Sequence, residues 1–81
     1  MRESTKRVYS EVEKMHRRYF GKGRVYESIV NGTFEQRTGD FERRAWELHK
    51  EAETEAAHKR IDAFIMALTE SRRVWKIKQK G

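Results

Sequence analysis

The sequence predicts a small, mostly helical α+β domain, and three observations lead to this fold class. The chain has no proline, four of its five glycines lie within residues 21–39, and Asn31-Gly32 separates two runs rich in β-forming residues. We therefore expect helices on both sides of a short β-hairpin, with an all-α chain of three helices as the alternative. With 81 residues there is room for one hydrophobic core, so residues 1–81 are predicted to form a single domain.

The first helix is predicted over about residues 5–20. Ser4 or Thr5 is suited to cap its free amide groups, and Gly21 follows as a residue that readily ends a helix. On a helical wheel the apolar side chains form one narrow stripe, which consists of Val8, Val12, Met15 and Tyr19. The basic side chains form a separate stripe, which consists of Lys6, Arg7, Lys14, Arg17 and Arg18.

The hairpin is predicted over about residues 24–38, with Asn31-Gly32 as a two-residue turn. Asn-Gly favours this turn because both residues tolerate a positive φ, and the turn places Ile29 opposite Phe34 on one apolar face. A short helix is the competing interpretation. The apolar residues before the turn also have helical spacing, and Asn31-Gly32 would then cap the C-terminus of that helix.

The last element is predicted to be one long helix over about residues 41–73, followed by a basic tail over 74–81. Asp40 is a suitable N-cap for this helix. The apolar residues form two stripes on roughly opposite sides: one consists of Phe41, Ala45, Leu48, Ala52 and Ala56, and the other of Trp46, Ala57, Ile61, Phe64 and Leu68.

Residues 61–68 are apolar almost all round the predicted helix, and such a surface requires burial on every side. We therefore expect a homodimer or higher oligomer, since a small charge-rich core often needs a partner chain. The alternative is a helix that breaks near residues 57–60 and folds back into a monomer. The residues expected at the oligomer or partner interface are Trp46, Ile61, Phe64, Ile65, Leu68 and Trp75.

The net charge of +6 is concentrated at the two ends of the chain. Residues 1–24 hold eight basic and three acidic side chains, and residues 70–81 hold five basic side chains and one acidic side chain. The stretch between them has more acidic than basic side chains. If the long helix runs antiparallel to the first, the two basic ends meet in one positive surface. The expected phosphate-contacting residues are Lys6, Arg7, Lys14, Arg17, Arg18, Lys22, Arg24, Arg72, Arg73, Lys76 and Lys78.

The sequence carries no pattern that predicts catalysis, a metal site or a cofactor. There is no cysteine, which excludes disulfides and Cys-based zinc sites and fits a reducing, cytoplasmic compartment. The one Glu-x-x-His pair, Glu55 and His58, lacks the further carboxylates of a metal site, and no nucleophile motif is present. We therefore expect no enzyme activity. We also expect no membrane association, because the longest apolar run is far too short to span a bilayer.

These patterns predict a small nucleic-acid-associated or regulatory protein that contacts the phosphate backbone of DNA or RNA through its two basic ends. We expect little base preference, since no known base-reading motif is present. The alternative function is an inhibitor or adaptor of the phage or mobile-element type, which binds an acidic surface of a larger host protein and blocks it. No motif assigns the chain to a family.

Overall fold

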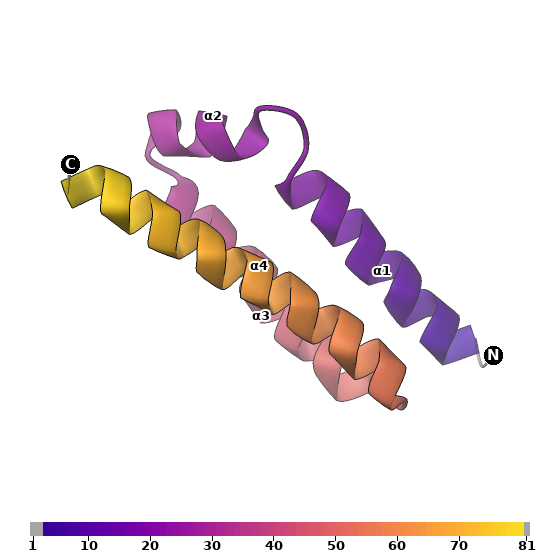
Figure 1. Cartoon of the computed structure of the whole chain (residues 1–81). Helices are drawn as coiled ribbons and strands as arrows, with labels where there is room; N and C mark the ends of the chain where they lie inside the picture. The colour runs from indigo at the N-terminus through magenta and orange to yellow at the C-terminus, as the bar shows by residue number, and fades with distance from the viewer. Residues whose placement is uncertain (1–2, 81) are drawn as a thin grey trace.

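The computed structural model describes residues 3–80, with side chains described for residues 5–78. This part of the chain is 88% helical and contains no strand. Its helices are, in order, α1 (Glu3–Tyr19), α2 (Arg24–Asn31), α3 (Phe34–Glu51) and α4 (Glu55–Lys80). Figure 1 shows α1, α3 and α4 side by side along a molecule with extents of 46 × 19 × 16 Å, and the short α2 at one end.

The predicted hairpin is wrong, and with it the α+β fold class. Residues 24–31 form α2, and Asn31-Gly32 ends this helix instead of joining two strands. Gly32 has φ 77°, and its N–H donates to the Ile29 carbonyl while the N–H of Thr33 donates to the Ser28 carbonyl. This pair of bonds is a Schellman cap, as in the alternative of a short helix. The all-α alternative is therefore right in class, although α1–α4 are four helices instead of three.

Helical periodicity across the start of α3 explains why no hairpin forms. Phe34 and Thr38 continue the stripe of Phe41, Ala45 and Leu48 backwards at steps of four and three residues. As part of a helix, Phe34 is 2% exposed and Thr38 is fully buried. A lone two-stranded hairpin would bury far less apolar surface, and it is marginally stable in water. The long-range helical pattern therefore outweighs the local β-propensity of these residues.

The single long helix predicted after Asp40 is also wrong, because residues 52–54 interrupt it. Ala52 adopts an extended conformation with φ −68° and ψ 131°, and the Ala57 N–H donates to Thr54 Oγ1 over 3.1 Å. Thr54 thus caps the N-terminus of α4. The break lies a little before the alternative break near residues 57–60, and α4 then extends through the predicted basic tail to Lys80.

The chain reversal at residues 52–54 explains the two opposed apolar stripes of the sequence. Because α3 and α4 are antiparallel neighbours, most of both stripes faces one core, whereas Trp46 and Ala56 are exposed. The apolar stripe predicted for α1 is confirmed and completes that core. The buried cluster consists of Val8, Val12, Met15, Tyr19, Ala45, Leu48, Ala52, Ala57, Ile61, Phe64 and Leu68. The segment expected to need a second chain is therefore buried on its inner side by its own chain.

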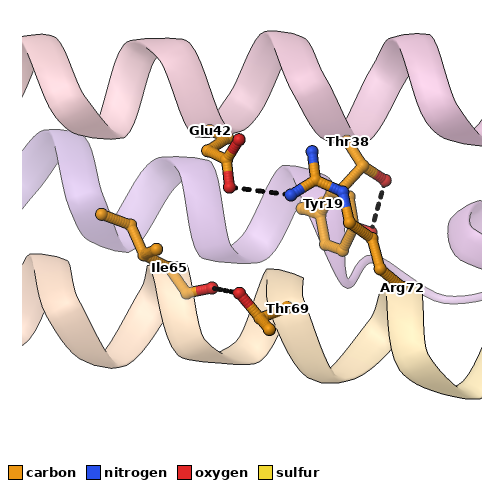
Figure 2. Close-up of polar contacts among 6 residues, drawn as sticks. All are labelled: Tyr19, Thr38, Glu42, Ile65, Thr69 and Arg72. Atoms are coloured by element: carbon orange, nitrogen blue, oxygen red, sulfur yellow. Dashed lines mark hydrogen bonds and ion pairs between the residues drawn. The ribbon is translucent and has the colours of Figure 1, made fainter.

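The last turn of α1 is joined to α3 by a buried polar junction. Tyr19 is fully buried, and its hydroxyl lies 2.8 Å from Thr38 Oγ1 (Figure 2). The Arg37 guanidinium donates to the carbonyls of Arg18 and Tyr19 and lies 4.8 Å from the centre of the Tyr19 ring. Arg37 thus satisfies free carbonyls at the C-terminus of α1 and places a positive charge at the negative end of its dipole.

A second polar contact joins α3 to α4 near the same end of the molecule. Arg72 Nη1 donates to Glu42 Oε2 over 2.7 Å, and both side chains are about one third exposed (Figure 2). The Phe34 ring stacks on Trp75 with the two ring centres 5.2 Å apart. These contacts hold the C-terminal half of α4 against the beginning of α3.

We predict that Tyr19→Phe and Thr38→Val each lower the free energy of unfolding by about 1–3 kcal/mol, because each leaves one buried hydroxyl without a partner. The double variant is expected to lose less than the sum of the two, since it leaves no unpaired group. Urea unfolding followed by circular dichroism measures all three. Strictly additive losses would show that the two hydroxyls do not act as a pair.

Two glycine substitutions are expected to change stability in opposite directions. Gly32→Ala forces a β-carbon into a left-handed conformation and lowers the free energy of unfolding by about 1–2 kcal/mol. Gly39→Ala lies within α3, where an added β-carbon meets no atom within 4 Å, and raises the free energy of unfolding by about 0.5–1 kcal/mol. The same urea experiment compares them, and a loss of stability in Gly39→Ala would contradict the helical placement of this residue.

Candidate nucleic-acid interface

The start of α1 and the end of α4 lie at opposite ends of the molecule, so the basic residues near the start of α1 do not join those near the end of α4 in one positive surface (Figure 1). The reversal at residues 52–54 makes α4 run parallel to α1 instead of antiparallel. Arg7, near the start of α1, pairs with Glu51 at the end of α3, with Nη1 and Oε1 2.5 Å apart. Arg72 pairs with Glu42, closer to the beginning of α3.

A smaller set of the predicted residues is brought together at the end of the molecule that holds α2, here called the α2 end. The last turns of α1, the start of α2 and the C-terminal half of α4 meet there. Residues 16–42 and 70–78, which build this end, carry nine basic and five acidic side chains. Residues 5–15 and 43–69, which build the rest of the molecule, carry eight basic and seven acidic side chains. The positive charge is therefore concentrated at the α2 end.

Ion pairing leaves this excess of positive charge in place, because each pair uses one positive and one negative side chain. Arg72 and Arg73 are paired with Glu42 and Glu70, and Arg17 is paired with Glu13. Five exposed cations of the α2 end make no side-chain hydrogen bond or ion pair within the described part of the chain. We call them the α2-end cations; they are Arg18, Lys22, Arg24, Lys76 and Lys78.

The α2-end cations lie on more than one side of this end instead of forming one flat patch. Arg24 lies beside Arg37 in a shallow pocket between α2 and α3, while Lys78 lines a groove between α2 and α4. Lys22 lies in the connection between α1 and α2, where Gly23 adopts φ 75°. Cations on several sides of one end suit a ligand that carries several negative charges, such as a polyanion.

The groove between α2 and α4 is the second feature of the α2 end. It has a volume of about 440 Å³, and its apolar lining includes Phe20, Val25, Tyr26, Ile29, Val74 and Trp75. Tyr26 is 73% exposed and Val74 is 41% exposed. The hairpin expected over residues 24–38 leaves no such groove, although the helical spacing of the apolar residues in this segment is a signal for it.

The residues predicted for an oligomer interface are divided by the structure. Ile61, Phe64 and Leu68 are at most 2% exposed and belong to the core of the chain itself. Ile65 is half-buried against that core, and Trp75 is half-buried against Phe34. Among the six, Trp46 is the most open, at 49% exposed, and it lies toward the middle of α3. Residues 61–68 are thus buried on one side by their own chain, Met66 in this segment is 71% exposed, and the expected oligomer stays a prediction.

Metal ligands and membrane-spanning segments were also sought among the described residues. No three His, Asp or Glu side chains of residues 5–78 are placed to hold a metal ion together. The closest arrangement is the stack of His49 on His58, with ring centres 4.4 Å apart and with His49 Nε2 3.4 Å from Asp62 Oδ1. Within residues 3–80, no helix has the length and apolar character needed to cross a bilayer.

No protein-family model, curated protein or solved structure matches the chain. A functional assignment therefore depends on the charges and the geometry of the α2 end.

The rim of the groove allows a test of its electrostatics. Two hydrogen bonds from Arg73, supported by its positive charge, lower the pKa of Glu70. We predict that Arg73→Gln returns the pKa of Glu70 to the ordinary range for a glutamate, as measured by NMR titration of its side-chain carboxyl carbon. Glu13 is the internal control, because the hydrogen bond from Arg17 lowers its pKa and is left in place.

The sign of the pH dependence follows from this shift. Since the pKa of Glu70 is lower in the folded than in the unfolded chain, its pairing stabilises the fold at pH values above the unfolded pKa. That contribution is lost as the pH falls through the lowered pKa. An unchanged Glu70 titration in Arg73→Gln would contradict the pairing.

Proposed function

We propose that the protein is a non-enzymatic nucleic-acid-associated protein that contacts phosphates through the α2-end cations. The observation that carries this proposal is that none of these cations has an acidic partner within the part of the chain that the structure describes. Three of the five carboxylates in the same region, Asp40, Glu42 and Glu70, already pair with arginines. The unpaired cations are therefore available to a ligand, and a polyanion is the ligand that gains most from several of them.

The proposed contact is to the nucleic-acid backbone. Lysine and arginine contacts to phosphate fix position on the nucleic acid and carry no base sequence information directly. The helix that follows the short turn after α2 is a poor recognition helix, because α3 buries one side in the core and exposes Glu35 and Glu47, among its arginines, on the other. Such carboxylates repel the phosphates that line a groove of the duplex.

We predict that the affinity for a short DNA or RNA duplex falls steeply with salt. If all five α2-end cations contact phosphates, the logarithm of the binding constant falls against the logarithm of the salt concentration with a slope of about −4.5. Replacing Lys22, Lys76 and Lys78 together by Glu is expected to lower affinity at least about 100-fold at low salt and to reduce the slope to about −2. Fluorescence anisotropy of a labelled duplex measures both quantities.

A matched control comes from three other exposed lysines that also make no ion pair within the described chain: Lys6, Lys14 and Lys50. Replacing these three by Glu also changes the net charge from +6 to zero, so the two triple variants differ only in where the charge is lost. We expect the control to keep a slope close to that of the unchanged protein. Equal losses in both variants, or no binding by the unchanged protein at low salt, would contradict the proposal.

Binding of another protein is the second candidate function. The observation that favours it is the groove between α2 and α4, whose exposed apolar side chains a phosphate backbone does not cover. This surface fits the adaptor or inhibitor considered from the sequence.

A further inference from the structure

The groove between α2 and α4 is an apolar surface that the chain itself leaves uncovered. One wall is formed by Val25, Tyr26 and Ile29 of α2, and the other by Val74 and Trp75 of α4. Exposed apolar surface with polar residues around it is a common place for a partner to bind. The walls are two helices, so the groove has the form that receives a third helix through side chains spaced three and four residues apart.

The charges around the groove indicate which kind of helix it receives. Lys78 lines the groove, and Lys22 follows closely after Phe20, another lining residue. Among the described residues of the lining, Glu70 is the only acidic one, and Arg73 occupies both of its carboxylate oxygens, over 2.5 and 3.2 Å. The unpaired charges at the rim are therefore positive, and they favour an occupant with acidic residues beside its apolar face.

We propose that this groove binds an acidic amphipathic helix of another protein. Its apolar residues would lie against Tyr26, Val74 and Trp75, and its carboxylates would pair with Lys22 and Lys78. A second copy of this chain suits the groove less well. Pairing two copies here brings two positively charged ends together, and Glu70 is already paired within its own chain. The inference does not depend on phosphate binding, although both ligands would need Lys22 and Lys78.

This shared use of cations has a regulatory consequence. An acidic helix in the groove neutralises part of the α2-end cations, so its binding and the binding of a phosphate backbone oppose each other. The helical partner would then compete with the nucleic acid for this protein, although it covers only the groove.

Trp75 offers a direct readout, because it lines the groove while Trp46 lies on α3 outside it. In the Trp46→Phe variant, the emission of Trp75 alone reports occupancy. The probe is a synthetic peptide of about 18 residues with leucines spaced three and four apart and glutamates at the remaining positions. A second peptide carries lysines in place of the glutamates, and a third has the same composition with the leucine spacing scrambled. We expect a saturable change in Trp75 emission with the acidic peptide and at least about tenfold weaker binding of the other two.

Two substitutions on α4 form the matched pair for this test. Val74→Asp places a carboxylate inside the groove, whereas Met66→Asp places one at a 71% exposed position of the same helix outside the lining. We expect Val74→Asp to weaken acidic-peptide binding at least about tenfold and Met66→Asp to change it by less than about threefold. Circular dichroism verifies that both variants keep their helix content, and Tyr26→Ala provides a second groove variant without added charge.

Three outcomes would overturn the inference. Equal binding of the acidic and lysine peptides would remove the charge argument, and equal effects of Val74→Asp and Met66→Asp would place the binding elsewhere. A dimer at micromolar concentration that Val74→Asp dissociates would show that a second copy occupies the groove. Since no nucleic acid is present, a failure of phosphate binding leaves this result unaffected.

Discussion

The junction of Tyr19, Arg37 and Thr38 is the constraint on which the α2 end depends. It joins the C-terminus of α1 to α3. The hydroxyls of Tyr19 and Thr38 form a buried hydrogen bond, and the Arg37 guanidinium donates two hydrogen bonds to free carbonyls of α1. Desolvation lowers the pKa of Arg37, but an arginine remains charged at any physiological pH. Since α2 has only eight residues, it is too short to be stable alone, and the helices that flank it determine its position. This junction therefore sets the position of α2 and of the cations beside it, while the contacts of α4 with α3 set the positions of Lys76, Lys78 and the other wall of the groove.

The reversal at residues 52–54 decides the distribution of charge on the molecule. A continuous helix would have carried the basic C-terminal residues far from the core, whereas the reversal returns α4 along α3 and leaves it parallel to α1. As a result the basic N-terminal residues face the acidic end of α3, where Arg7 meets Glu51. The C-terminal basic residues instead join those that follow α1. The basic residues of the two chain ends are thus divided in space: the end with Arg7 is nearly balanced in charge, and the α2 end keeps the positive excess.

The candidate site was predictable in part from the sequence, and the limits have physical causes. The identity of the α2-end cations follows from charge clustering, because exposed lysines and arginines need no tertiary contact to be recognised as charged. Their separation from Lys6 and Lys14 did not follow, since it depends on the direction of α4. The groove was missed because Tyr26 and Ile29 fit a strand as well as a helix, and short apolar runs do not distinguish the two. Only the burial of Phe34 and Thr38 in the core shows that a helix forms here and not a strand.

The sequence alone determined the apolar stripe of α1, the C-capping role available to Gly32, and the absence of cysteine chemistry. These are local properties, set by side-chain spacing and by the conformations that single residues tolerate. The tertiary structure decided whether Asn31-Gly32 turns a hairpin or ends a helix, where the chain reverses after α3, and which apolar residues face inward. Each of these choices compares the burial available to distant segments, and that comparison exists only once the helices are packed together.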